Sequence, residues 1–204
     1  MLSNSCSRPR RSQYLIVLPE NNFLKFSREI CDVTLQNNPY YINFSRDEIY
    51  EHVPLLREYL VNLGIEEKMW RVMFTTKKPP EQRFRKISSI HIDAVNKHFT
   101  HSINIPIVDC ENTYTLWYKG VVRLLDQTLN PHIGNNDKPM ENFAIVEDHE
   151  AKEICRVETV RPMIINTTIP HRGWSMKPSR VLCCIRFKPD LTEEEFDRIL
   201  AYNV

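Results

Sequence analysis

From residue 84 onward the chain breaks into short runs of β-branched and aromatic residues, separated by Asn, Pro, Asp and Gly. Runs of this length with turn residues between them are typical of a β-sandwich or barrel. Earlier in the chain, residues 13–20 also resemble a short strand, and residues 68–76 alternate between apolar and polar positions. The later strands are expected at 84–92, 102–108, 113–120, 143–147, 153–160, 162–168 and 180–187.

Helical spacing of apolar residues occurs in two other segments. The first is 45–63, which begins at the N-cap candidate Ser45 and ends before Gly64. Pro54 lies inside this pattern, so it either kinks one helix or begins a second. The second segment is 191–200, where a Thr and a Glu three residues apart form a capping box, at Thr192 and Glu195.

Together these elements predict a mainly β chain with flanking helices. The expected core is a double-stranded β-helix, the cupin-like jelly roll. We expect a mobile tail at 1–12 and a single domain at 13–204. Its parts would be an N-terminal region of helix and strand at 13–80, a barrel at 84–188 and a C-terminal helix at 192–202. The polar segment 123–141 is expected to be an extended loop.

Composition narrows the function classes. Net charge is +1, from 27 basic and 26 acidic residues, which gives no reason to expect nucleic acid or an anionic membrane as partner. Only 4 glycines occur and none forms a phosphate-binding loop, which argues against P-loop and dinucleotide sites. The 6 cysteines include no CxxC pair. We therefore expect reduced cysteines and, without an apolar run long enough to span a membrane, a soluble cytoplasmic protein.

The most informative chemistry begins at the end of the strand 84–92. His91 and Asp93 are two residues apart, so on a strand their side chains point the same way. An imidazole and a carboxylate make up two thirds of the facial triad that holds non-heme Fe(II). His171, eighty residues later, is the candidate third ligand. Arg180 follows nine residues after it and can clamp a carboxylate with two parallel hydrogen bonds.

This series of motifs resembles the iron(II)- and 2-oxoglutarate-dependent dioxygenases. It consists of HID at 91–93, SINIPIV at 102–108, and INTTIPHRGW followed by SRVLCCIRF at 165–187. The resemblance covers residues 84–188 and is closest to the aspartyl/asparaginyl β-hydroxylase-like and the phytanoyl/prolyl-hydroxylase-like branches.

The resemblance implies a metal-binding oxidoreductase with Fe(II) held by His91, Asp93 and His171. Arg180 would bind the distal carboxylate of the cosubstrate 2-oxoglutarate, and Tyr114 and Asn104 are further candidates for cosubstrate binding. With dioxygen, such a dioxygenase hydroxylates an unactivated C–H bond. The expected substrate is an amino acid, a peptidyl side chain or another small acid.

Two departures from the pattern of these dioxygenases leave open which arginine binds the distal carboxylate of 2-oxoglutarate. Several of these families carry Ser or Thr two residues after the arginine, where this chain has Leu182. Arg186 is a rival anchor, since it lies on the same face of a regular strand as Arg180.

Two other functions are compatible with the same pattern. A cupin-type metal enzyme would use no 2-oxoglutarate and would take a further ligand from His98 or His101. A non-catalytic β-sandwich would serve as a binding module and need no metal. The remaining histidines are expected to be exposed to solvent: His52, His132 and His149. The partner is expected to be a small-molecule or peptidyl substrate, and the sequence does not predict an oligomeric state.

Overall fold

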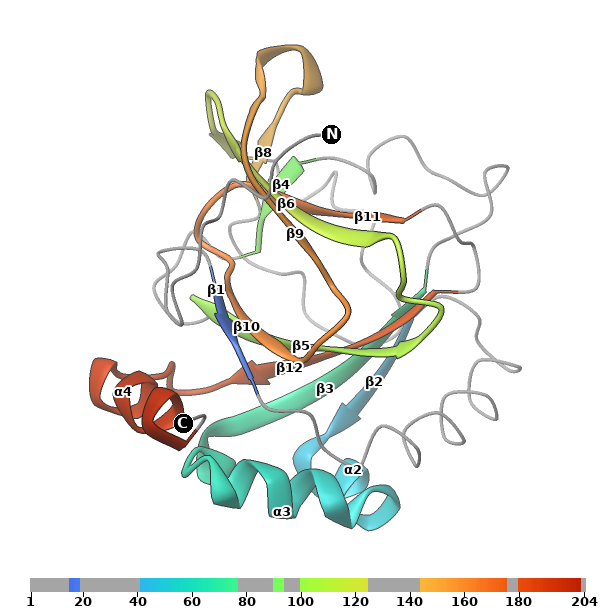
Figure 1. Ribbon diagram of the computed structural model, residues 1–204, viewed down its shortest axis with the longest axis vertical. Coiled ribbons are helices and arrows are strands. Elements are labelled where there is room, and N and C mark those ends of the chain that lie inside the picture. The colour runs from blue at the N-terminus through green and yellow to red at the C-terminus, as the bar shows by residue number, and fades with distance from the viewer. Residues whose placement is uncertain are drawn as a thin grey trace.

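Two antiparallel sheets face each other in the computed structural model (Figure 1), which describes residues 15–18, 41–76, 90–93, 100–124, 144–175 and 180–202. Within these residues each sheet has six strands. The first sheet runs in the order β1 (Leu15–Val17), β10 (Met163–Asn166), β5 (His101–Val108), β12 (Val181–Phe187), β3 (Met69–Thr76), β2 (Tyr41–Ser45). The second runs in the order β7 (Arg123–Leu124), β8 (Ala144–Val146), β4 (Ile90–Ile92), β11 (His171–Ser175), β6 (Thr113–Lys119), β9 (Lys152–Glu158).

The order of the strands is that of a double-stranded β-helix. The chain alternates between the sheets, with β3 and β5 in the first sheet and β4 and β6 in the second. After β9 in the second sheet it alternates again through β10, β11 and β12. This double crossing produces a jelly roll, and it confirms the predicted fold class of a mainly β chain with flanking helices.

The helices lie mostly against the outside of the first sheet (Figure 1). They are α2 (Arg46–His52), α3 (Pro54–Asn62) and α4 (Glu193–Tyr202), with short 3₁₀ turns at Glu66–Lys68 and Asp148–Glu150. Pro54 is the first residue of α3, so it begins a second helix and does not kink the first. The predicted capping box at Thr192 with Glu195 is present. The predicted N-cap Ser45 is also present, and it forms a capping box with Glu48 that was not predicted.

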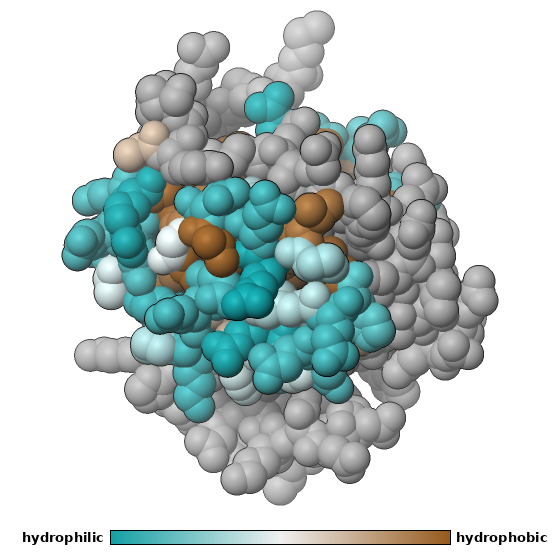
Figure 2. Space-filling view, turned by 90° about the horizontal axis from the view of Figure 1, so that it is seen from below, coloured by the Kyte–Doolittle hydropathy of each residue, from teal (hydrophilic) through white to brown (hydrophobic). Residues whose placement is uncertain are grey.

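The main core lies between the helices and the outer face of the first sheet. Alternate residues of the central strands, such as Val72, Ile103 and Ile185, pack there against helical residues that include Leu60 and Phe196. Polar helix residues remain outside, and the described surface seen from below is mostly hydrophilic with small hydrophobic areas (Figure 2). Because strand side chains alternate, the intervening residues of these strands point into the space between the two sheets.

A smaller core fills part of the space between the sheets. Trp117 of β6 is fully buried there against Met163 and Ile165 of β10, and its indole nitrogen donates a hydrogen bond to the Asn166 carbonyl at 3.1 Å. A second small cluster, on the inner face of the first sheet, consists of Met73, Leu182 and Cys184.

Some sequence expectations differ from the structure or lie outside it. Strands β2 and β11 were not predicted, and residues 123–124, assigned to a loop, form the short strand β7. The expected tail 1–12, residues 84–89 and the rest of the loop from 125 lie outside the described residues, and the domain boundaries stay a prediction.

The expectation of reduced cysteines is wrong for one position. Cys155 is disulfide-bonded, whereas Cys110, Cys183 and Cys184 are buried thiols. Among the described helices, none is both long and apolar enough to cross a bilayer. The cytoplasmic location stays a prediction.

Candidate metal centre

Strands β4 and β11 bring the two distant histidines together. They are antiparallel neighbours in the second sheet, with His171 directly opposite His91, and the ring centroids lie 4.7 Å apart. Asp93 follows β4, and its backbone N–H donates to the Thr167 carbonyl at 3.3 Å. One potential ligand atom from each of His91, Asp93 and His171 lies within 4.8 Å of the others. Three residues predicted from sequence spacing therefore form one cluster.

Hydrogen bonds orient the imidazoles within this cluster. His171 Nδ1 lies 3.0 Å from the Ile169 carbonyl oxygen, and since a carbonyl only accepts, Nδ1 carries the proton. The other nitrogen, Nε2, keeps its lone pair and lies 3.8 Å from Asp93 Oδ2. His91 Nε2 lies 3.2 Å from Asp93 Oδ1. A backbone partner of this kind commonly fixes the tautomer of a metal-binding histidine.

The surroundings hold His171 and Asp93 in the protonation states that a metal needs. Burial lowers the pKa of His171 from 6.5 to about 4, although the nearby Asp93 carboxylate opposes the change. Burial alone would raise the pKa of Asp93, but the Arg186 guanidinium, the His91 hydrogen bond and the His171 charge bring that pKa well below 3.8. A neutral imidazole and an ionised carboxylate are both metal ligands. This donor set of two nitrogens and one carboxylate fits Fe(II).

Arg186 is engaged with the carboxylate of this cluster. It lies on the inner face of β12, and its Nη2 donates a short, buried hydrogen bond to Asp93 Oδ2. Both side chains are almost fully buried. The sequence indicated that Arg186 faces the same way as Arg180, but not that it contacts a predicted metal ligand.

Arg180 lies elsewhere in the space between the sheets. It immediately precedes β12, and its guanidinium lies beside Gly173 on β11: a Cβ added to Gly173 would be 3.5 Å from Nη1 and 3.6 Å from Nη2. Gly173 shares the inner face of β11 with His171, two residues away, which is about 7 Å along a strand. The guanidinium is thus within reach of the His–Asp–His cluster.

The buried Nε of Arg180 has no hydrogen-bond partner among the described residues. Burial lowers the pKa of Arg180, and the nearby titratable groups that oppose this effect are the thiols of Cys184 and Cys110. No carboxylate of the described residues forms an ion pair with it, yet a guanidinium stays protonated in proteins. A buried charged donor of this kind calls for a partner, and an anionic ligand is one that fits.

Two other predicted residues, Tyr114 and Asn104, are not part of the cluster. Tyr114 is on the opposite face of β6 from the buried Trp117, and its ring packs 5.7 Å from that of Trp174 and near the Arg156 guanidinium. The structure therefore does not bring Tyr114 to the cluster. Asn104 does face the space between the sheets, where it is buried and accepts a hydrogen bond from the Ser102 hydroxyl at 3.0 Å.

His101, one candidate extra ligand of the cupin-type alternative, is not part of this cluster. The His101 ring contacts Thr100 Oγ1 at 2.7 Å, Asp190 Oδ2 at 3.5 Å and the Phe196 ring at 4.6 Å. These contacts join the start of β5 to the C-terminal helix. His98 lies outside the described residues.

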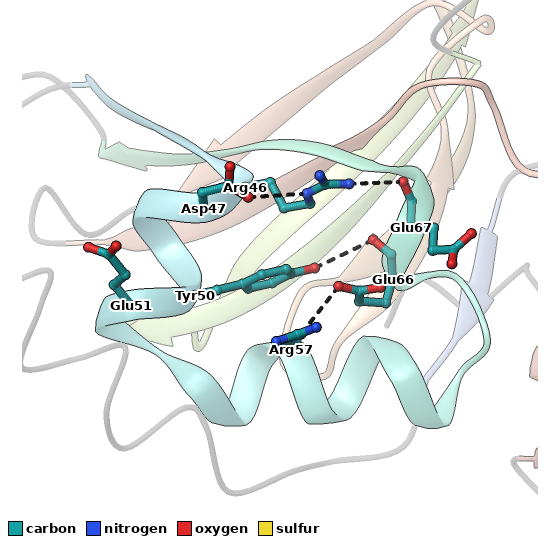
Figure 3. Close-up of a pocket in the computed structure, with 7 residues that line it drawn as sticks. All are labelled: Arg46, Asp47, Tyr50, Glu51, Arg57, Glu66 and Glu67. Atoms are coloured by element: carbon teal, nitrogen blue, oxygen red, sulfur yellow. Dashed lines mark hydrogen bonds and ion pairs between the residues drawn. The ribbon is translucent and has the colours of Figure 1, made fainter.

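A polar hollow lies apart from this cluster, beside α2 and α3 (Figure 3). Its walls are held by internal contacts: the Tyr50 hydroxyl donates to the Glu66 carbonyl at 3.5 Å, and Arg57 pairs with the Glu66 carboxylate at 3.3 Å. Burial, reinforced by the Glu66 charge, raises the pKa of Tyr50. Its lining comes from α2, α3 and the 3₁₀ turn Glu66–Lys68, on the outer side of the first sheet and away from the space between the sheets.

Comparisons with known proteins give several similar solved structures, among them SnoK and EvdO2. No protein-family model and no curated protein matches the chain. SnoK, a non-heme α-ketoglutarate-dependent carbocyclase from nogalamycin biosynthesis, is 11% identical with a TM-score of 0.46, over 97% of this chain and 90% of SnoK. EvdO2 from Micromonospora carbonacea var. aurantiaca, solved with 2-oxoglutarate, is 13% identical with a TM-score of 0.43, over 90% of each chain. Similarity this low carries no argument about the activity of this chain.

Proposed function

We propose that this chain is an Fe(II)- and 2-oxoglutarate-dependent oxygenase. The observation that carries the proposal is the cluster of His91, Asp93 and His171 inside a double-stranded β-helix, with the guanidinium of Arg180 further along the same inner surface. The cluster supplies three ligands to one side of a metal ion. The remaining positions are then available to a chelating cosubstrate and to dioxygen.

The separation between cluster and guanidinium suits 2-oxoglutarate. About 7 Å of strand separates His171 from Gly173, against which the guanidinium lies. A five-carbon dicarboxylate can chelate a metal through its 2-oxo acid end and still extend its distal carboxylate over such a distance. The buried Nε of Arg180, which has no acceptor among the described residues, supports this role.

Arg186 and Arg180 have different roles in this proposal. Arg186 already donates to Asp93, so Arg180 is the better candidate for the distal carboxylate.

Leu182 and Met73 lie on the inner face of the first sheet and form an apolar wall that helps to exclude water. When bound, iron with 2-oxoglutarate supplies the capacity to oxidise an unactivated C–H bond using dioxygen. The proposed substrate is an amino acid, a peptidyl side chain or a small acid, and hydroxylation is the proposed outcome.

The test is an anaerobic titration of metal-stripped protein with Fe(II) and then 2-oxoglutarate, which follows the visible metal-to-ligand charge-transfer band. We expect the band in the wild type. We expect its loss in His171→Ala, which removes a metal ligand, and a much weaker cosubstrate affinity in Arg180→Met. Arg156→Met is the matched control, because Arg156 is exposed and pairs with Glu153 on the outside of the barrel.

Each outcome has a distinct meaning. Fe(II) binding without a band on addition of 2-oxoglutarate would favour a cupin-type metal enzyme. The absence of Fe(II) binding would favour a non-catalytic binding module. A band that is unchanged in Arg180→Met would retain the oxygenase and reject Arg180 as the anchor.

A further inference from the structure

We infer that Arg186 is a positioning residue for the metal ligand Asp93: it holds one carboxylate oxygen, so that Asp93 offers only the other to the metal. The inference rests on the proposed function, because it treats Asp93 as a metal ligand. It concerns a residue of the opposite sheet, since β12 belongs to the first sheet and Asp93 follows β4 of the second.

The two oxygens of Asp93 have different partners. Oδ2 accepts the short hydrogen bond from Arg186 Nη2. Oδ1 lies 3.2 Å from His91 Nε2, the nitrogen on the side of the proposed metal. With its side chain almost fully buried, Asp93 has little freedom to rotate and exchange these oxygens. The guanidinium thus selects the rotamer in which Oδ1 faces His91, while the held Oδ2 lies 3.8 Å from His171 Nε2.

The position of Arg186 follows from the alternation of side chains between the two faces of β12. Residues 181, 183, 185 and 187 pack outward into the main core, so residues 182, 184 and 186 point inward. Arg186 is directly opposite Ser102 of β5, at the end of the barrel where β4 ends and β5 begins. A planar guanidinium there reaches across the interior to the carboxylate.

The consequence for the metal is a single-oxygen carboxylate ligand. A carboxylate that chelated through both oxygens would occupy one of the positions that the cosubstrate and dioxygen need. The ion pair also keeps the buried carboxylate charge balanced before any metal arrives, so the ligand is already oriented when binding begins. Loss of Arg186 would leave this carboxylate buried with one partner fewer.

The experiment measures Mn(II) alone, without 2-oxoglutarate, on metal-stripped protein by calorimetry and by electron paramagnetic resonance. We expect Arg186→Met to weaken Mn(II) binding about 10–100-fold and to change the Mn(II) spectrum. Arg186→Gln keeps an N–H donor without the charge and is expected to recover part of the affinity and the wild-type line shape. Arg156→Met is the control, since Arg156 is an exposed arginine that pairs with Glu153 on the outside of the barrel, and it is expected to keep the wild-type Mn(II) affinity.

The outcomes separate this inference from the proposed function. Wild-type affinity and spectrum in both Arg186 variants would overturn the positioning role and leave the oxygenase standing. Tighter Mn(II) binding in Arg186→Gln would also overturn it, because Arg186 would then act mainly by repelling the metal. If the wild type binds no Mn(II) or Fe(II), both proposals fail. Circular dichroism reports whether Arg186→Met folds, and if it does not, Arg186→Gln decides the result.

Discussion

Lowering the pH of the metal-free protein from about 7 to about 4.5 is expected to destabilise the fold through His171. The folded state resists protonation of this buried imidazole, whose pKa falls from 6.5 to about 4. Above pH 6.5 the side chain is neutral in both states, so its contribution to stability is fully present. Below this value the unfolded chain binds a proton that the folded chain does not, and stability is lost until about pH 4.

The size of the effect follows from the same shift in pKa. Each pH unit within this window removes roughly 1 kcal/mol of unfolding free energy, so acidification to about pH 4.5 costs about 2–3 kcal/mol. The contribution of Asp93 to stability changes in a lower pH range than that of His171. The pKa of Asp93 is depressed below 3.8, so its contribution is present above that value and is lost only at lower pH. The slope between pH 6.5 and 4.5 therefore reports on His171 and not on Asp93.

The assay is urea denaturation in the presence of a chelator at several pH values, for wild type and two variants. His171→Gln removes the titrating group and is expected to flatten the slope, whatever its effect at neutral pH. His149→Gln is the control, because His149 is exposed and should keep the wild-type slope. If His171→Gln and wild type lost stability equally between pH 6.5 and 4.5, the assignment of this titration to a buried, neutral His171 would be refuted.

Three other predictions test the packing, the helix start and the metal ligands. Trp117→Ala should cost about 3–5 kcal/mol in urea denaturation, since it opens a cavity between the sheets and removes the hydrogen bond to the Asn166 carbonyl; a loss below about 1 kcal/mol would contradict this packing. Ser45→Ala should cost about 0.5–2 kcal/mol in the same assay by removing the capping box of α2, and an unchanged midpoint would argue against the cap. Mn(II) at about a hundred times its Kd should stabilise the wild type by about 2.7 kcal/mol in thermal unfolding, and an equal gain in His91→Ala would exclude His91 as a ligand.

Local patterns were sufficient for most elements of this fold. The N-cap at Ser45, the capping box at Thr192 and the strand 102–108 were predicted because each depends on neighbouring residues. Strand β11 was missed for a physical reason. Its inward positions are the candidate ligand His171, Gly173 beside the Arg180 guanidinium, and Ser175, which is hydrogen-bonded to Thr113. None of the three is apolar core, so HRGWS lacks the apolar alternation that marks a strand.

The candidate site shows the same division between local and long-range information. His91 and Asp93 could be paired from sequence because a spacing of two puts both on one side of a strand. The identity of His171 as their neighbour was predicted from a family resemblance, and the pairing of β4 with β11 brings the two histidines together. No local rule connects residues that are eighty positions apart.

The sequence by itself determined the spacing of apolar residues, the helix caps and which residues of each strand share a face, since these depend on backbone geometry over a few residues. Only the tertiary structure decided which face of each strand points inward. The helices cover the outer face of the first sheet, which turns Arg186 toward Asp93, and the register of β6 turns Tyr114 away from the interior. That choice depends on contacts between distant segments. Arg180 and Arg186 share one face, and only their partners on the other sheet, Gly173 for Arg180 and Asp93 for Arg186, distinguish them.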